Sequence, residues 1–505
     1  MNRRRSRSGV LALSTSVACG LLAGCAVSPV ALTDVELAEL ADQKLADVTA
    51  DQDPITGAVD LQEAIARALK YNLDHQVGLA EQAVRERELR LAHFNLLPGV
   101  VASSGYAARD SFNASNSVNV LTGNQSLATS TSQEKKLRTS DIAFSWNILD
   151  FGLSYVRARQ AADKVLVQSE LRRKVAVRIV ENVRATFWRA VSAQRLLGQV
   201  QRVEAEARDV EREARQLSAD GQTSRMTALT YEREIVELQR TIGELTRELN
   251  TALAELGALM NVQPGTRIRV AASAPVLPSL PSGRMADLIH VAMVNRPELR
   301  EVQYQKRINE HEAHAALLEM LPGLSLVAGG NYDSNDFLLN NNWVNWGAKA
   351  GWNLLKVFSY PARRDVIEEQ DTMFETRSLA VTMAIMTQVY VSRVRYAHAA
   401  KEYRTARRYR DVQRELRNQI RTEAAAGRVS RQTKVREELN TLVAEAKLDL
   451  AYAAVQSAFA NVETSLGRDP FGGAIAPDAS VAEIAHALRI YRPAASWSMR
   501  IVNAD

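Results

Sequence analysis

Cysteine, proline and aromatic residues are scarce in this chain of 505 residues, which has two cysteines, 13 prolines and 6% aromatics. With so few cysteines, a small scaffold held together by disulfide bonds is excluded. Proline interrupts helices, so the long proline-free stretches favour helical structure. The length exceeds what one ordinary hydrophobic core needs, which leaves either several domains or one elongated body.

A strong charge imbalance is also missing. The chain has 63 basic and 58 acidic residues, for a formal net charge of +5. Arg3, Arg4, Arg5 and Arg7 stand in the first 24 positions, where there is no acidic residue, so the remainder is nearly neutral. No basic stripe interleaved with aromatics occurs, and we therefore expect no nucleic-acid binding.

The common motifs of catalytic sites are absent as well. The sequence has neither a phosphate loop of the G-x-x-x-x-G-K type nor a G-x-S-x-G elbow. His311 and His314 fall on adjacent turns of a predicted helix, but two imidazoles without a third ligand are a weak metal signal. We predict that the chain is not an enzyme and holds no metal. The two histidines are expected on a solvated helix face.

The N-terminus has the pattern of a secretory signal. Its basic residues precede an apolar run at about 10–22 that is too short for a membrane-spanning helix. The run ends in Leu22-Ala23-Gly24-Cys25, which resembles the lipobox of bacterial lipoproteins, and Ala26 resembles those sent to the outer membrane. We interpret 1–24 as a lipoprotein signal peptide and Cys25 as the lipidation site, the lipid being the only attached group expected. An ordinary signal peptide with a chance cysteine is the alternative.

One unit occurs twice in the chain. At one offset Ala64-Ile65 matches Leu288-Ile289, and at the same offset the Leu-Pro-Gly at 97–99 matches the Leu-Pro-Gly at 321–323. Beyond this point the first copy has a longer segment, after which the Trp-Asn pairs at 146 and 352 and the glycines at 221 and 427 match at a second offset. Two copies are too few for a solenoid, so we predict a duplicated architecture.

The repeat divides the chain as follows. Residues 25–58 form a tether with one short helix at about 34–46. Repeat 1 covers 59–264, with a helix at about 61–95 that Asp60 caps, a β-hairpin at 99–150 and a long helical hairpin turning at 221. Repeat 2 covers 285–470, with a helix, a β-hairpin at 323–355 and a long helical hairpin turning at 427. The linker 265–284 and the segment 471–505 are expected to wrap the body as a collar.

Four segments alternate between apolar and polar residues with a period of two, which predicts strands with one apolar and one polar face. The aromatics expected to face lipid are Tyr106, Phe144, Trp146, Tyr332, Trp346 and Trp352. Such strands suit a membrane β-barrel, whose strands need about 9–11 residues. Four strands cannot close a barrel, so closure requires two chains with eight strands or three with twelve. Two soluble hairpins packed on a core are the alternative.

A very long helix follows each hairpin. The stretch 362–426 contains neither proline nor glycine, and 153–220 contains only Gly198. The returning helix of the first copy has apolar residues in strict heptads, which predicts a coiled-coil seam. A similar stripe on the second long helix is also interpreted as packing. The two sets are Ile235, Leu238, Ile242, Leu245, Leu249, Ala252 and Leu256, and Leu379, Met383, Met386, Tyr390, Val394 and Ala397.

The segments at 61–72 (LQEAIARALKYN) and 146–152 (WNILDFG), Leu97-Pro98 and the two turn glycines together resemble the outer-membrane efflux protein family, the TolC-like channel-tunnels. The resemblance covers about 58–470. It implies a mainly helical fold with a membrane β-barrel portion: duplicated long helical hairpins and four strands per chain, built into a homotrimer. It also implies a twelve-stranded barrel in the outer membrane on a twelve-helix tunnel across the periplasm.

The same resemblance implies partners and a site. A periplasmic adaptor and an inner-membrane transporter would supply the drive, and outer-membrane lipid would surround the barrel. The expected adaptor-docking or gating tip consists of Gly221, Ser224, Arg225, Gly427, Ser430 and Arg431. For the two serines, helix capping is an equally good interpretation.

The sequence departs from the family at two places. Thr433 and Arg436 stand where family members often carry acidic residues, with Glu437 and Glu438 nearest, so a preference for cations does not carry over. The second strand-to-helix corner, 355–361 (LKVFSYP), replaces the Asp-Phe-Gly of the first.

The sequence leaves three functions open. The favoured one is a passive conduit for small molecules in a tripartite efflux system. The second is an outer-membrane channel for type I protein secretion or polysaccharide export. The third is a non-conducting periplasmic coiled-coil scaffold lipoprotein.

Overall fold

A computed structural model describes residues 29–126, 128–220, 224–271, 275–468 and 479–490. The chain divides into two compact units, Met1–Gln52 and Asp53–Asp505. The first unit contains helix α2 (Asp34–Asp47), which confirms the short helix expected there. Thr33 caps it by accepting a hydrogen bond from the Glu36 amide, while the Glu36 carboxylate accepts one from the Thr33 amide. The sequence placed the end of the tether at 58, whereas the division falls after Gln52.

In the second unit, helices of equal length recur in the two halves of the chain. The pairs are α3 (Leu61–Tyr71) and α7 (Met285–Asn295), α4 (Leu73–Phe94) and α8 (Pro297–Leu318), α5 (Ile148–Ala219) and α9 (Leu354–Ala425), and α6 (Arg225–Leu259) and α10 (Arg431–Ser465). The long helices α5 and α9 each have 72 residues, and α6 and α10 each have 35. None of the described helices has both the length and the apolarity needed to cross a membrane.

The helix expected at 61–95 is two helices rather than one. Asp60 does cap its start, accepting the Glu63 amide at 2.7 Å. Asn72, however, adopts an extended conformation, and its side chain accepts the amides of Asp74 and His75, which starts α4. The second copy breaks at Arg296, which Pro297 holds in an extended conformation.

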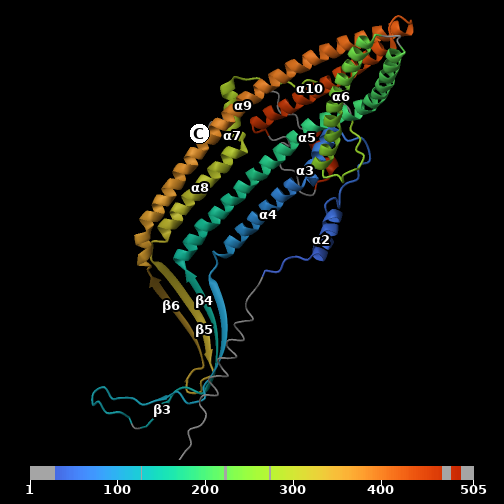
Figure 1. The fold of residues 1–505 in the computed structure, drawn as a ribbon. Coiled ribbons are helices and arrows are strands. Elements are labelled where there is room, and N and C mark those ends of the chain that lie inside the picture. Colours follow the sequence, from blue (N-terminus) through green and yellow to red (C-terminus); the bar gives the residue numbers. More distant parts are fainter. Residues whose placement is uncertain (1–28, 127, 221–223, 272–274, 469–478, 491–505) are drawn as a thin grey trace, which may run out of the picture. The chain divides into compact units, whose positions relative to one another are not determined.

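The four main strands form one antiparallel sheet in the order β1-β4-β5-β6 (Figure 1). They are β1 (Gly99–Ala108), β4 (Lys136–Asn147), β5 (Gly323–Asp333) and β6 (Asn342–Gly351). β4 pairs with β5, so the two repeats join in the centre, and β1 and β6 are left as edges. The loop between β1 and β4 contains the short pair β2 (Ala114–Ser115) and β3 (Ser130–Thr131).

Both strand-to-helix corners lie earlier than the sequence predicted. α5 begins at Ile148, which had been counted in the strand, and α9 begins at Leu354 instead of 362. Asn147 and Asn353 explain this, because each side chain accepts an amide from the first turn that follows. Pro361 lies inside α9, where it removes one helical hydrogen bond but does not end the helix.

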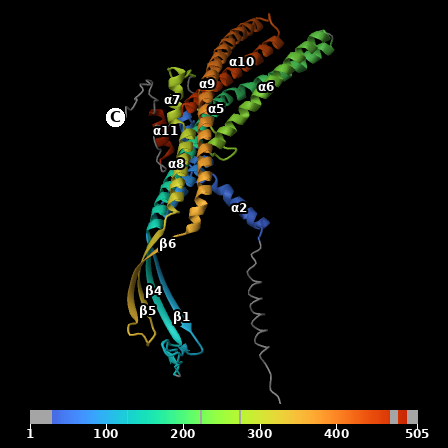
Figure 2. The same cartoon turned by 90° about the vertical axis from the view of Figure 1, so that its left-hand side faces the viewer.

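Next to the sheet, whose four main strands are labelled in Figure 2, the helices lie in the order α4, α5, α8 and α9 (Figure 1). Beyond α3 and α7, the long helices continue and pair with α6 and α10, and α10 packs against both α5 and α9. The main hydrophobic core lies between these two regions, where α3, α5, α9, α10 and α11 (Val481–Ile490) meet. Two smaller cores follow the helical hairpins toward their tips.

The first heptad stripe is confirmed as packing, whereas the second is not buried within this chain. On α6, Ile235, Ile242, Leu249 and Leu256 are buried. On α9 the buried residues instead include Ile385, Val389, Tyr396 and Tyr403. The predicted α9 stripe is exposed: Leu379, Met383, Met386, Tyr390, Val394 and Ala397. Heptad spacing identified an apolar face but not which face the chain covers.

The described parts of the linker and the C-terminal segment pack on this body. The Val59 backbone forms hydrogen bonds with Arg269 and Ala271. Between them, the Val270 amide donates to the Gln194 side chain, and the Val270 carbonyl accepts from it. Helix α11 packs on α3, and Arg489 pairs with Asp60 at 2.6 Å.

Candidate functional site

The register of the sheet sorts its side chains onto two unlike faces. Val100, Phe144, Ala328 and Trp346 form one row across the four strands, and the alternation places the next such row at Ala102 and its partners. The apolar side chains of this face are exposed, with Trp346 at 86%. An exposed apolar surface of this extent marks an interaction with lipid or with another protein.

The opposite face is mostly polar. Ser103 donates to Asp141 at 2.9 Å, and Asn331 donates to Asn345 at 2.6 Å. Trp343 is also on this face, so the separation is incomplete. A wall with one apolar and one hydrogen-bonding face suits a boundary between lipid and water.

The predicted aromatics lie at three levels of the sheet. Tyr106 and Tyr332 are near the strand ends farthest from the helices and are exposed, while Phe144 and Trp346 lie in one row. At the helical end, Trp146 is half-buried and packs edge-on against Phe151, with ring centroids 5.8 Å apart. Trp352 lies just beyond β6, where its Nε1 donates to the Met320 carbonyl at 2.8 Å.

The tip residues Ser224 and Ser430 are helix caps. Ser224 accepts the Thr227 amide at 3.2 Å, and Ser430 accepts the Thr433 amide at 3.2 Å. Gly427 has φ +72°, and the Arg428 amide bonds the Glu423 carbonyl at 3.0 Å, which closes α9 in a Schellman turn. Gly221, like Cys25, lies outside the described residues.

The two arginines of the tip differ. Arg431, the first residue of α10, pairs with Glu213 of α5 at 3.2 Å. Arg225, the first residue of α6, forms no ion pair with any residue that the structure describes. Only the second-repeat arginine therefore connects the two helical hairpins.

Further contacts near the tip, which sequence reasoning missed, also connect the hairpins. Tyr231 of α6 donates to the Gln432 carbonyl at 3.3 Å, and burial raises the pKa of its phenol to about 12. Arg436 of α10, where the family often has an acid, pairs with Glu234 of α6 at 3.0 Å. Arg436 and Glu234 are on different hairpins, so no motif within one hairpin could reveal this pair.

An ionic cluster joins α8 to both long helices near the ends that adjoin the sheet. The Glu312 carboxylate accepts from Arg157 at 2.5 Å, from Gln160 at 3.0 Å and from Arg363 at 2.7 Å. Burial alone would raise the pKa of Glu312, but the three hydrogen bonds lower it to about 2. Arg363 also donates to Glu319 at 2.7 Å. This cluster fixes the two repeats to each other.

His311 is not on a solvated face, in contrast to the expectation from the sequence. Its side chain is 15% exposed, and Nε2 lies 3.5 Å from the Asp163 carboxylate of α5. Arg307 donates to both oxygens of Asp163. His314 is exposed as predicted. In the described ranges, no group of three or more histidine, cysteine or acidic side chains is placed to hold a metal ion.

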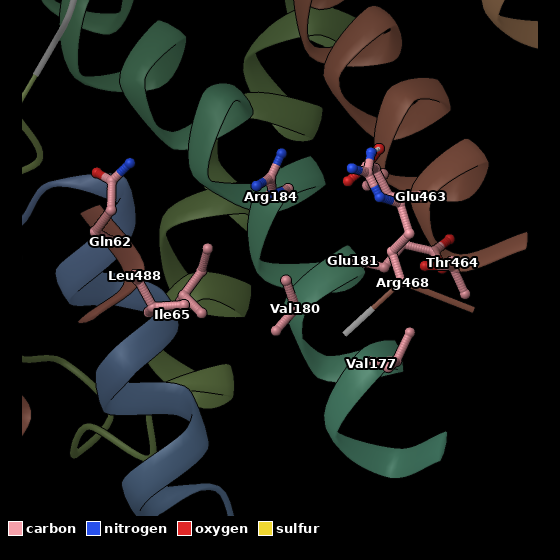
Figure 3. Close-up of a pocket in the computed structure, with 11 residues that line it drawn as sticks. Gln62, Ile65, Val177, Val180, Glu181, Arg184, Glu463, Thr464, Arg468 and Leu488 are labelled. Atoms are coloured by element: carbon pink, nitrogen blue, oxygen red, sulfur yellow. Dashed lines mark hydrogen bonds and ion pairs between the residues drawn. The ribbon is translucent and has the colours of Figure 1, made fainter. Parts of the chain in front are cut away.

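A small polar cavity lies between α3, α5, α10 and α11 (Figure 3). Burial lowers the pKa of Arg184 and raises the pKa of Glu181, while Arg468 pairs with Glu463 at 2.7 Å. Its volume of about 90 Å³ accommodates a few water molecules. The charges around it balance, so the cavity is structural in character.

No protein-family model and no curated protein sequence matches the chain. Solved structures do match. The outer-membrane channel CmeC of Campylobacter jejuni has a TM-score of 0.65 at 13% identity, covering 92% of this chain and 97% of that one. CusC, whose structures concern the conformational changes that accompany folding and transmembrane channel formation, has a TM-score of 0.62 at 19% identity. The match covers 84% of this chain and 96% of that one. The open state of the outer-membrane channel MtrE of Neisseria gonorrhoeae has a TM-score of 0.63 at 15% identity. The match covers 81% of this chain and 89% of that one.

The chain thus has the fold of the outer-membrane channels. This is the TolC-like fold of long duplicated helical hairpins and a four-stranded sheet that the sequence predicted.

Proposed function

We propose that this protein is the outer-membrane channel of a tripartite efflux system. Three copies form a passive conduit for small molecules, anchored by a lipid on Cys25. The energy for transport comes from an inner-membrane transporter, which a periplasmic adaptor couples to the channel. The observation that carries the proposal is the sheet, which has an exposed apolar face, a polar face and two open edges.

The open edges favour assembly of several copies. An unpaired strand edge cannot remain in lipid, because its backbone groups have no water to bond. The β6 edge of one copy and the β1 edge of the next can pair around a ring, and three copies give twelve strands. Twelve strands leave a lumen, which the polar face would line.

The helices support the same head-to-tail arrangement. The outer helices α4 and α9 each carry an exposed apolar stripe. On α4 it consists of Leu73, Val77, Val84, Leu91 and Phe94, and on α9 of the residues from Leu379 to Ala397 named above. Heptad-spaced stripes of this kind pack against each other in coiled coils. The α4 stripe of one copy would therefore pack against the α9 stripe of the neighbouring copy.

Adaptor docking and gating are proposed to occur at the helical tips. The residues proposed for this role are Gly221, Ser224, Arg225, Gly427, Ser430 and Arg431. The exposed Arg431–Glu213 pair and the Tyr231–Gln432 contact hold the two hairpins together. Breaking such contacts would let the hairpins separate by repacking of helix against helix.

Single-channel conductance in planar bilayers tests the proposal. The purified lipidated protein is expected to form three-copy particles and discrete conducting steps. A protein that migrates as a monomer and leaves the bilayer silent would be a scaffold rather than a conduit. The Cys25→Ala variant should lose the lipid mass but keep the conductance once reconstituted.

A further inference from the structure

A second cavity, of about 270 Å³, lies between α5, α9 and α10. Its lining comes from both repeats and includes Pro275 of the linker. The volume is sufficient for one small organic molecule of one or two rings.

Aromatic side chains form one side of this cavity. The rings of Trp188 and Tyr452 meet edge to face with centroids 4.8 Å apart. Tyr403 lies 5.5 Å from Tyr452. The three side chains are buried, and planar ligands pack favourably against such rings.

The charges around the cavity favour an anion. Arg195, Arg407 and Arg410 line it, with Asp449 as the only acid among its lining residues. Arg195 pairs with Asp449, and Arg410 pairs with Asp411 at 2.7 Å. Arg407 forms no ion pair with the described residues, so its guanidinium is available to a ligand.

One buried polar atom of the lining lacks a hydrogen-bond partner within the described chain. It is the Trp188 Nε1, and Trp188 is more than nine-tenths buried. An unsatisfied buried donor is costly, and a bound acceptor would remove that cost. The Trp188 Nε1 and Arg407 together favour a ligand that accepts hydrogen bonds.

The repeat offers an internal comparison. The residues that match Trp188, Arg407 and Tyr452 in the other copy are Val394, Gln201 and Thr246. The aromatic and cationic features are therefore specific to this side of the duplicated fold. Packing requirements common to both copies do not explain them.

We infer that the cavity between α5, α9 and α10 binds a small aromatic carboxylate. Its ring lies against Trp188, Tyr403 and Tyr452, and its carboxylate pairs with Arg407. The site lies within one chain, so it does not depend on the proposed channel activity.

Equilibrium dialysis of 2-naphthoate against the full-length purified protein tests the inference. One saturable site per chain is expected, and the neutral 2-naphthylmethanol and the non-aromatic acetate should each bind roughly tenfold more weakly or worse. Arg407→Gln should weaken 2-naphthoate binding roughly tenfold or more, because a hydrogen bond to a charged group is lost.

Arg404→Gln is the matched control. Arg404 is exposed on the same helix and does not line the cavity, so binding should be unchanged. Binding without saturation, equal loss in the two arginine variants, or equal affinity for the neutral alcohol would overturn the inference. Conductance measured on the same variants would be unaffected in either case.

Discussion

At the scale of single residues, the exposure of an ion pair determines whether it contributes to stability or to switching. The Arg431–Glu213 pair at the tip is 59% and 48% exposed, so solvent screens it. The Glu312 carboxylate is 26% exposed on α8, between two long helices, and its bonds are short. The two places call for different experiments.

Charge reversal at the tip should change gating rather than stability. Arg431→Glu places two carboxylates together across the hairpins, which favours the separated state. We expect higher conductance and altered drug export with little change in melting temperature. Single-channel recording, drug sensitivity and thermal melting measure the three quantities.

The double variant Arg431→Glu, Glu213→Arg should restore the parental conductance, and Arg225→Glu should have little effect. A large drop in melting temperature with unchanged export would contradict the gating role.

The Glu312 cluster should make the free energy of unfolding depend on pH in the acidic range. The folded-state pKa of about 2 is below the ordinary 4.5. The contribution is therefore fully present above pH 4.5 and is lost as the pH falls toward 2. Glu312→Gln should lower stability at neutral pH by on the order of 1 kcal/mol, because solvent screens part of the interaction, and the difference from the parent should shrink in acid. Thermal melting from pH 7 to pH 3 measures it.

Glu368→Gln provides the comparison, since Glu368 pairs with Arg364 on the exposed side of one helix. Its melting temperature should match the parent at every pH. A Glu312→Gln variant that is as stable as the parent at pH 7 would show that the cluster adds nothing to stability.

At the scale of elements, replacing the glycine of a left-handed turn should cost a different amount of stability at two helix ends. Gly427 and Gly467 both end helices in the left-handed conformation, with φ +72° and +67°. A Cβ at position 427 would meet no atom within 4 Å, whereas at 467 it would lie 2.7 Å from the Asn295 backbone. Gly427→Ala should cost about 1 kcal/mol from backbone strain alone. Gly467→Ala should cost clearly more.

Thermal melting of the two glycine variants, compared with the parent, checks this order. Equal losses would mean that the backbone around Asn295 can move aside without cost.

Much of this element structure follows from local sequence signals. The period-two alternation predicted the four strands, and proline-free stretches predicted the two long helices. The break at Asn72 was missed because one capping side chain starts a new helix inside a continuous helical pattern. The early start of α9 was missed because proline was treated as a boundary, although the helix passes through Pro361.

The site was less accessible to sequence reasoning. Serine caps and turn glycines have local signals, but the partners of Arg431 and Arg436 are on a different hairpin, more than 200 positions away. The lining of the α5–α9–α10 cavity comes from both repeats, so only the folded chain brings Trp188 and Arg407 to it.

At the scale of the whole molecule, the exposed stripes on α4 and α9 should control assembly. Val84→Glu and Met383→Glu each place a charge where a neighbouring copy would bury it, at a cost of several kcal/mol. The three-copy species should fall at least about tenfold in light scattering of detergent-solubilised protein. Arg90→Glu, exposed on another side of α4, should assemble normally. Full assembly of both stripe variants would exclude these surfaces as the interface.

The two long helices have the same number of residues, and so do the two returning helices. In the assembled conduit, these equal helix lengths would set the distance between the two membranes. Seven residues add about 10 Å to a helix, so inserting them in one helix alone would stagger its hairpin against the other. Lengthening the protein to bridge a wider gap would require matching insertions in all four helices at once.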